Sequence, residues 1–406
     1  MHYVGIDWAD EKHDIYITND SGKKLACFEI SNDQKGMLKL LAKIQKLSKD
    51  TSSILFAMEK SSGPLAEFIL DHNYTLYSIN PKVVDRYRDR HKVSGAKTDP
   101  IDAMVLAHIL RTDRHQFRPL LPDSELARKI KLLSRDRDNL VKAKTRILNK
   151  LRANLKEYFP AAARAFKNLD KREVIKFLRK YPSHEEAAQL RKEEIKNFFR
   201  GSGHSFKKIE KIYSILQVPS IQVPQFIVEA KKRYTLALLA QLPPLIKQIK
   251  EYKEEISRLM DKHPEKNIFR TLPGSGDTIS ARLLGELGDN KERFKDYSSY
   301  QCYGGTAPIT KYSGKMRRGV KARRACNRGL KQTVSQLAFC SLRRSTWARE
   351  YYIKKKKGGY SHSQALVALG NKWLKILFAL RKKKEIYKEE FHLMMKEKHR
   401  MKAIPA

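Results

Sequence analysis

The order of β-rich and helical runs in the first 115 residues constrains the fold more than any other feature of the sequence. Three β-rich runs at hairpin spacing come first, over residues 3–8, 14–18 and 25–30, with turn residues between the last two. The pattern then alternates: a helix over 37–47, a strand over 53–58, a helix over 63–72, a strand over 75–79, and helices starting at 81 and 99. This order predicts a mixed sheet with helices on its faces.

Three consecutive strands followed by alternating helices and strands are typical of the ribonuclease-H-like (RuvC-like) fold. We therefore expect an α/β domain of this type over residues 1–120.

From about residue 125 the apolar period changes from two to a heptad. Eight positions from Leu126 to Leu151 alternate steps of four and three, with polar interruptions at Arg137 and Lys144, and a second such stretch runs from Leu245 to Leu259. Two heptad helices about 90 residues apart predict an antiparallel coiled-coil stalk over 121–265, with a small helical insert near 174–216 at its tip. Ordinary helix packing, or self-association between protomers, would give the same pattern.

The sequence pattern changes again at Leu272, where LPGSGDTISARLL has the form of a helix-hairpin-helix element. Gly274 and Gly276 allow a tight turn whose amides, at a helix start, can hold a backbone phosphate. A plain Pro-Gly turn between two helices is the alternative. We expect a mainly helical domain over 266–385, followed by a basic tail over 386–406 to which we assign no role.

The net charge of +40 is concentrated in the later part of the chain. Residues 1–100 carry 15 basic and 14 acidic side chains, whereas residues 301–406 carry 27 and 5, with no carboxylate between Gln301 and Arg349. Charge of this density needs counter-ions, which nucleic-acid phosphates commonly supply. A merely soluble basic surface is the alternative, and nucleic-acid binding is the better interpretation.

Several classes of protein are excluded at this point. No apolar run reaches 18 residues, and the amino terminus lacks the basic and apolar regions of a signal peptide. The four cysteines form no CxxC pair, which argues against a disulfide framework and a cysteine zinc site. We expect a cytoplasmic protein with a polyanionic partner.

Four carboxylates lie where ribonuclease-H-like nucleases need them. Asp7 ends the first strand, Glu59 ends the fourth, and Asp99 and Asp102 are three apart at the start of a helix. Hard divalent ions such as Mg²⁺ (or Mn²⁺) take oxygen ligands, and two of them about 4 Å apart can clamp both oxygens of a phosphodiester exchange. The four residues are therefore the predicted catalytic and metal ligands.

Each carboxylate also has a simpler interpretation. Asp99-Pro100 followed by Asp102 is a common helix start, with an Asp cap and a carboxylate favoured by the helix dipole. Glu59 is next to Lys60, which suits a surface ion pair. Asp7 is harder to explain, because a carboxylate between Ile6 and Trp8 is costly unless it is paired.

A serine lies in the middle of the acid-free basic region, in GGTAPITKYSGKMRRG. A serine beside a glycine is usually a turn residue. Ser313, however, is surrounded by basic residues that can hold a scissile phosphate and assist attack by a hydroxyl. The predicted nucleic-acid-binding residues here are Lys311, Lys315, Arg317, Arg318, Arg323, Arg324 and Arg328. Residues 317, 321, 324 and 328 have the spacing of one exposed helix face.

With these residues in view, the sequence resembles the DEDD-type transposases of bacterial insertion sequences, the one-hundred-and-ten family of bridge-RNA-guided recombinases. The resemblance covers nearly the whole chain. It rests on GIDWA, AMEKSSG, INP and KTDPIDA in the first part, FLRKYPSHEEAAQL in the middle, and LPGSGDTISARLLGELGD, YGGTAP and YSGK in the last part.

The resemblance implies a composite site and a particular set of partners. Asp7, Glu59, Asp99 and Asp102 match the metal-binding tetrad of the family, and Ser313 matches its serine nucleophile, which forms a covalent phosphoserine linkage to DNA. The implied partners are donor and target DNA, a structured bridge RNA that selects sequence by base pairing, and further copies of the chain in a homodimer or homotetramer.

Two other functions remain open on the sequence. In a RuvC-like, structure-specific nuclease the tetrad would activate water without a covalent intermediate, and Ser313 would be a turn residue. A non-catalytic RNA-binding protein would use only the basic surface, but the four carboxylates argue against it.

Overall fold

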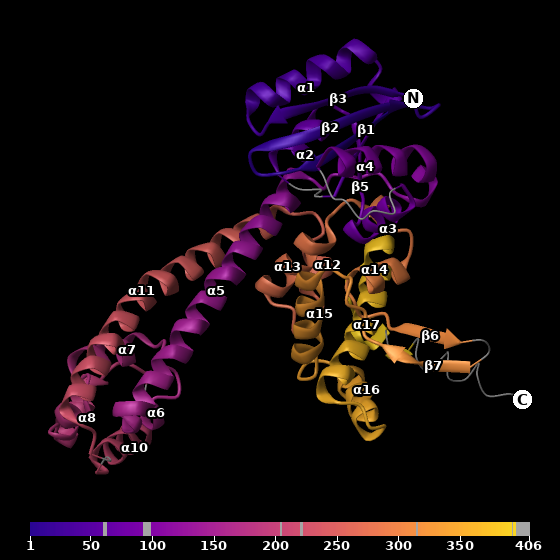
Figure 1. Ribbon diagram of the computed structural model, residues 1–406. Coiled ribbons are helices and arrows are strands. Elements are labelled where there is room, and N and C mark those ends of the chain that lie inside the picture. Colours follow the sequence, from indigo (N-terminus) through magenta and orange to yellow (C-terminus); the bar gives the residue numbers. More distant parts are fainter. Residues whose placement is uncertain are drawn as a thin grey trace, which may run out of the picture. The chain divides into compact units, whose positions relative to one another are not determined.

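The computed structural model describes residues 1–59, 63–91, 99–203, 205–219, 222–313, 316–391 and 393–394. The chain divides into two compact units, Met1–Asp123 and Ser124–Ala406, which are described separately (Figure 1). The finer division predicted from the sequence, at residues 120, 265 and 385, stays a prediction. Among the described residues, no helix is both long and apolar enough to cross a membrane.

The first unit is built on a five-stranded sheet with the strand order β3-β2-β1-β4-β5. The strands are β1 (His2–Trp8), β2 (Lys12–Asn19), β3 (Lys24–Ser31), β4 (Ile54–Met58) and β5 (Thr75–Ser78). β2 pairs antiparallel with β1 and β3, whereas β4 pairs parallel with β1 and β5. The helices are α1 (Gln34–Leu47), α2 (Pro64–Asp71), α3 (Pro81–His91) and α4 (Asp99–Asp113). The predicted mixed sheet with helices is confirmed, and its order is compatible with a ribonuclease-H-like domain.

The two faces of the sheet pack against different helices. Along β1, Val4 and Ile6 lie in a buried cluster with Leu40 of α1, while Tyr3 lies in a second cluster with Leu106 of α4. This alternation follows from the two-residue period of a strand. Odd-numbered residues of β1, including Asp7, therefore belong to the face that α4 covers.

α4 lies directly against β1 because residue 5 has no side chain. A Cβ atom added to Gly5 would lie 1.9 Å from the carbonyl oxygen of Ala103. Near the other end of α4, Arg111 donates to the carbonyl oxygen of Asp20, beyond β2 and close to the start of β1. α4 thus runs antiparallel to β1, and its first turn lies toward Asp7.

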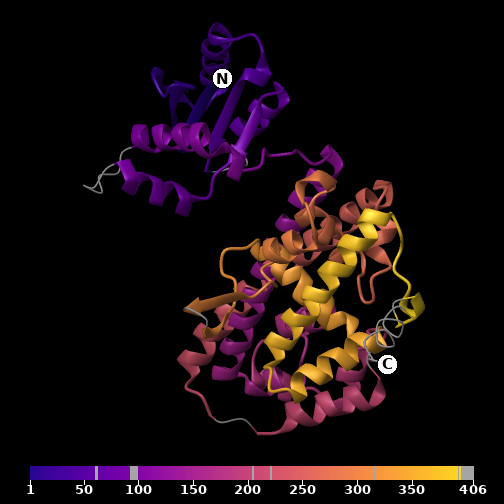
Figure 2. The same ribbon diagram turned by 90° about the vertical axis from the view of Figure 1, so that its right-hand side faces the viewer.

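The second unit contains a helical bundle that carries a β-hairpin. The bundle helices are α12 (Lys266–Arg270), α13 (Asp277–Leu287), α14 (Tyr297–Tyr303), α15 (Arg328–Ser341), α16 (Thr346–Lys357) and α17 (His362–Lys383). Leu283, Leu337 and Trp373 share one buried cluster that joins α13, α15 and α17. The hairpin strands β6 (Ile309–Ser313) and β7 (Met316–Lys321) pair antiparallel and project from the bundle (Figure 2).

The hairpin corrects one prediction. Arg317 and Lys321 do not share a helix face with Arg324 and Arg328, because Met316–Lys321 is a strand and α15 begins only at Arg328. The basic residues have helical spacing, but no apolar stripe accompanies them, and residues 309–313 supply β-forming partners. Charge spacing without apolar periodicity was therefore a poor guide to the element here.

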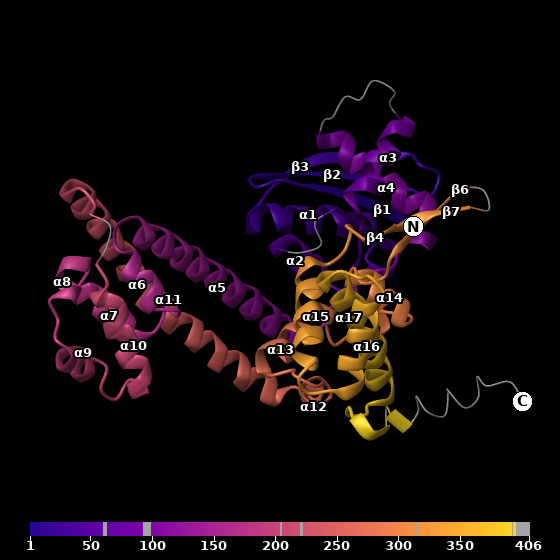
Figure 3. The ribbon, with the colours of Figure 1, turned by 90° about the horizontal axis from the view of Figure 1, so that it is seen from below.

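Two long helices, α5 (Glu125–Tyr158) and α11 (Gln225–Lys262), lie side by side and antiparallel (Figures 1 and 3). Ile130, Leu151, Ile256 and Leu259 from the predicted heptads are buried. A helical insert lies at the end of the pair that is far from α13, and it consists of α6 (Pro160–Ala165), α7 (Arg172–Lys180), α8 (His184–Ala188), α9 (Lys192–Phe198) and α10 (Phe206–Gln217). The two long helices contain the predicted heptad positions, and the insert begins at Pro160, before the predicted residue 174. The division into a coiled-coil stalk stays a prediction.

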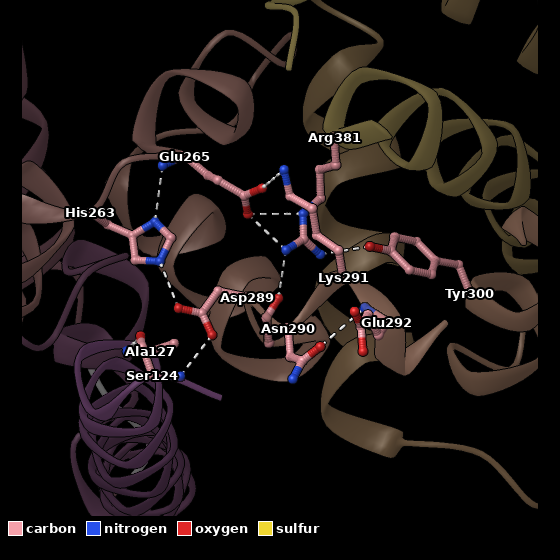
Figure 4. Close-up of polar contacts among 11 residues, drawn as sticks. Ser124, Ala127, His263, Glu265, Asp289, Asn290, Lys291, Glu292, Tyr300 and Arg381 are labelled. Atoms are coloured by element: carbon pink, nitrogen blue, oxygen red, sulfur yellow. Dashed lines mark hydrogen bonds and ion pairs between the residues drawn. The ribbon is translucent and has the colours of Figure 1, made fainter. Parts of the chain in front are cut away.

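A buried polar network joins the start of α5 to the bundle (Figure 4). Arg381 of α17 donates to Glu265 (Nη2–Oε2 2.7 Å), to the Tyr300 hydroxyl (2.6 Å) and to the carbonyl oxygen of Gly288 (2.8 Å). Next to Gly288, Asp289 accepts a hydrogen bond from the backbone amide of Ser124 (2.9 Å). This network fixes the first residue of the second unit to the bundle core.

Candidate active site

Two of the predicted carboxylates lie at adjacent strand ends. β1 and β4 are parallel neighbours, and the last residues that pair are Ile6 and Met58. Asp7 and Glu59 are the next residues on each strand, so they leave the sheet at the same edge. Continuing the side-chain alternation places both carboxylates on the face covered by α4.

Asp102 lies in the first turn of α4, where its side chain is buried and forms an ion pair with Arg88. The Arg88 guanidinium on α3 contacts Asp102 Oδ1 through Nε (2.7 Å) and Nη2 (2.6 Å). The side chains of Arg88 and Asp102 are only 13% and 5% exposed. Burial opposes the charge of Arg88, but hydrogen bonding to Asp102 and its negative charge raise the pKa of Arg88 above its usual value.

The structure brings three of the four predicted ligands to one end of the sheet without assembling them around a common point. Asp99 begins α4, but its side chain lies outside the described part of the chain. Among the described residues, no three His, Cys, Asp or Glu side chains form a group that could hold a metal ion. The tetrad therefore stays a prediction. Carboxylate oxygens are the type of ligand atom that a hard divalent cation prefers.

The strand register adds an acidic residue that the sequence reasoning missed. Asp14 of β2 lies directly opposite Asp7 of β1. Carboxylates opposite one another on an antiparallel pair repel unless a cation lies near them. Asp14 had no distinguishing signal in the sequence, because its position depends on the register of a hairpin whose turn has no marked glycine.

Ser313 is the last residue of β6, and its backbone pairs with Met316 at the end of the hairpin. Gly314 and Lys315 lie outside the described residues, as do the side chains of Ser313, Lys311, Arg317 and Arg318. Arg318 is the extra residue at a bulge in β7, between the pairs Lys311–Gly319 and Tyr312–Arg317. The structure thus places the serine at the end of an antiparallel hairpin, with basic residues on both strands.

The segments before β6 and after β7 are both hydrogen-bonded to α14. On the β6 side, the backbone amides of Thr306 and Ala307 donate to the carbonyl oxygen of Gln301. On the β7 side, the Asn327 amide donates to the carbonyl oxygen of Tyr303 at 2.8 Å. Gly305 has a φ of +64°, and a Cβ on it would lie 2.5 Å from Cys326 Sγ. Residues of the YGGTAP sequence therefore pack and hydrogen-bond at the base of this hairpin, where it joins α14.

A buried carboxylate supports the same junction. Asn327 caps α15 by accepting from the Leu330 amide (2.9 Å), and its side chain donates to Glu286 Oε2 (2.7 Å). Arg135 of α5 also donates to both oxygens of Glu286. Burial raises the pKa of Glu286, but these two partners outweigh it and hold the pKa below its usual value. Glu286 was not singled out from the sequence, because its partners lie 41 and 151 residues away.

The remaining predicted nucleic-acid-binding residues lie around this junction and at the start of α13. Arg324 and Arg328 are exposed, and Arg323 is half-buried. Gly274 has a φ of +79°, and a Cβ on it would lie 2.7 Å from the backbone of Cys340, so this glycine is needed for packing. Gly276 precedes α13 and has open space around it. Phosphate binding by these residues stays a prediction.

Comparison with known proteins gives consistent matches along the chain. A family model described as "Transposase" matches residues 4–160, and one described as "Transposase IS116/IS110/IS902 family" matches residues 266–353. The mini-circle putative transposase for IS117 of Streptomyces coelicolor is 34% identical over 384 residues, covering 92% of each chain. An uncharacterized 44.8 kDa protein of insertion element IS116 from Streptomyces clavuligerus is 25% identical, covering 95% of this chain and 96% of its own length.

These matches define the class of the protein as a transposase, an enzyme that cuts DNA and transfers its strands. The chain belongs to the IS116/IS110/IS902 family of insertion-sequence transposases.

Proposed function

We propose that this transposase is guided by a structured RNA and cuts and rejoins DNA with two sets of residues. Asp7, Glu59, Asp99 and Asp102 hold divalent Mg²⁺ (or Mn²⁺), and Ser313 is the nucleophile. The observation that carries the proposal is the parallel pairing of Ile6 with Met58, since it sets Asp7 and Glu59 at adjacent strand ends.

The acidic residues act as oxygen ligands and position the scissile phosphate. Asp7 and Glu59 leave the same sheet edge, and the first turn of α4 is held near them by the contact at Gly5. When bound, a divalent ion supplies Lewis-acid stabilisation of the charge that develops on the phosphate.

Ser313 supplies the attacking oxygen. Its Oγ forms a bond to phosphorus while the bond from phosphorus to a sugar oxygen breaks, and that oxygen leaves with the serine proton. Lys311, Lys315, Arg317 and Arg318 are close to Ser313 in the sequence and can offset the charge of the phosphate. Arg323, Arg324, Arg328, Gly274 and Gly276 extend the surface that holds the nucleic-acid backbone.

The proposed partners are donor and target DNA and a bridge RNA, in a homodimer or homotetramer of the chain. A net charge of +40 supports binding of such polyanions. Action on chromosomal DNA would place the protein in the bacterial cytoplasm, at the nucleoid.

The proposal is tested by trapping DNA on the protein. Wild-type protein incubated with divalent metal, its co-purified RNA and DNA is expected to give a covalent adduct that survives a denaturing gel. Ser313→Ala removes the only proposed attacking oxygen, so the adduct should disappear. Ser298→Ala, an exposed serine on α14, is the matched control and should leave the adduct unchanged.

Two results would contradict the serine mechanism. One is an adduct that persists in Ser313→Ala. The other is efficient cleavage without any adduct, which would favour the metal-dependent nuclease.

Arg88 gives a second test, which does not depend on activity. Arg88 neutralises the buried Asp102 carboxylate, so Arg88→Gln is expected to destabilise the metal-free protein by about 3 kcal/mol. Mg²⁺ bound near Asp102 would replace the lost positive charge, and it should therefore raise the melting temperature of Arg88→Gln more than that of the wild type. Arg86→Gln, exposed on the same helix, is the control. An equal response to Mg²⁺ in all three proteins would argue against Asp102 as a ligand.

A further inference from the structure

The helical insert contains a cavity that neither the sequence patterns nor the proposed active site uses. Its volume is about 480 Å³, and it lies between α6, the segment that joins α6 to α7, the start of α7, residues 202–203 after α9, and α10. Pockets of this size accept a nucleotide-sized group.

Positive side chains surround the cavity. Its basic lining residues are Arg164, Lys167, Lys171, Lys208 and Lys211. Glu173 is the one carboxylate among the described residues that line it. Side chains of like charge that face a shared space repel one another, so the arrangement favours a bound anion.

Two acidic residues that are adjacent in sequence to these basic residues pair with lysines outside the cavity. Asp170, adjacent to Lys171, pairs instead with Lys144 of α5 at 2.8 Å. Glu210, adjacent to Lys211, pairs with Lys192 of α9 at 2.7 Å. Within the described part of the chain, none of the five basic residues forms an ion pair.

The walls of the cavity are held in place from outside it. Arg152 of α5 donates to the carbonyl oxygens of Ala163 (3.1 Å) and Lys167, which fixes the segment after α6. Val174 of α7 and Ile212 of α10 are each 2% exposed and supply apolar lining. The cavity thus combines a formed apolar wall with a basic rim.

We propose that this cavity binds one unstacked nucleotide of a single-stranded nucleic acid, with the basic rim on its phosphates and the apolar wall against its base or sugar. Duplex DNA does not present an isolated nucleotide, whereas RNA loops and displaced DNA strands do. The inference rests on the proposed nucleic-acid binding of the chain and adds a site in the second unit, within the insert.

The test compares two doubly substituted full-length proteins that lose the same charge. Lys208→Gln/Lys211→Gln removes two rim residues, whereas Lys176→Gln/Lys207→Gln removes two exposed lysines of α7 and α10 that do not line the cavity. Binding is measured by fluorescence anisotropy at several salt concentrations, with labelled 12-nucleotide RNA, DNA of the same sequence, and the DNA duplex.

The rim variant is expected to bind single strands about tenfold more weakly than wild type. Its plot of log affinity against log salt should be shallower by about 1.4, since each single-strand phosphate contact contributes about 0.7. The control should keep most of its affinity, and the RNA and DNA arms show which strand is preferred.

Three results would overturn the proposal: equal losses in both variants, an unchanged rim variant, or an equal loss for the duplex. No binding by the wild-type protein would instead reject the nucleic-acid binding on which the inference rests.

Discussion

Asp7→Asn is expected to abolish DNA cleavage while leaving nucleic-acid binding intact. Asn keeps the size and polarity of the side chain but removes the negative charge that a divalent ligand needs. A loss of about 4 kcal/mol of transition-state stabilisation corresponds to roughly a 10³-fold slower reaction. Strand breakage is measured on end-labelled DNA in the presence of Mg²⁺, and binding is measured separately by anisotropy.

Asp10→Asn is the matched control, because Asp10 lies three residues further on, in the exposed turn after β1, and loses the same charge. Its cleavage rate should stay within about twofold of the wild type. Cleavage by Asp7→Asn at the rate of Asp10→Asn would reject Asp7 as a ligand. Loss of both cleavage and folding, seen by circular dichroism, would point to a structural role instead.

Arg381→Met is expected to have the largest effect on stability. Arg381 is 3% exposed, and it is the partner of Glu265, Tyr300 and the carbonyl oxygen of Gly288. Burial lowers the pKa of Arg381, but Tyr300 and Glu265 outweigh it, so the guanidinium stays charged. Removing it leaves Glu265 buried with less compensation, at a cost of about 4 kcal/mol. For a unit of this size the melting temperature should fall by roughly 10 °C.

The neighbouring substitution Lys382→Met separates this effect from loss of surface charge, since Lys382 is exposed on the same helix. It should shift the melting temperature by about 1 °C or less. Adding Glu265→Leu to Arg381→Met should recover part of the stability, because the buried charge is removed with its partner. Equal shifts for Arg381→Met and Lys382→Met would show that the network contributes little.

The elements that sequence reasoning found correctly are those whose apolar period is long or strongly marked. β1, β4 and α5 carry such patterns, and each begins within one residue of its predicted start. The second long helix was also predicted, but α11 begins at Gln225, twenty residues before the heptad positions that indicated it. The hairpin around Ser313 was missed, because basic residues carry no period-2 signal and the spacing of four suggested a helix. The close approach of α4 to β1 also requires a glycine at position 5, and no apolar periodicity reveals that requirement.

In the candidate site, the sequence predicts the residues whose position follows from strand order, but not those whose role depends on tertiary contacts. Asp7 and Glu59 follow apolar strands, and the topology of parallel neighbours predicts that they share an edge. Arg88 was not predicted as the partner of Asp102, because α3 holds several basic residues and only the packing of α3 against α4 selects one. Likewise Asp14 and Glu286 acquire meaning only from register and tertiary contact.

The contact between Gly5 and Ala103 has a consequence for mutational scanning of this enzyme. Any side chain at position 5 would collide with the backbone of α4 and push away the turn that carries Asp102. A scan that records only transposition would therefore find that substitutions at Gly5 are tolerated as poorly as those at Asp7, although glycine has no functional group. Reading abundance alongside activity would separate the two, since changes at Gly5 lower the amount of folded protein whereas Asp7→Asn does not.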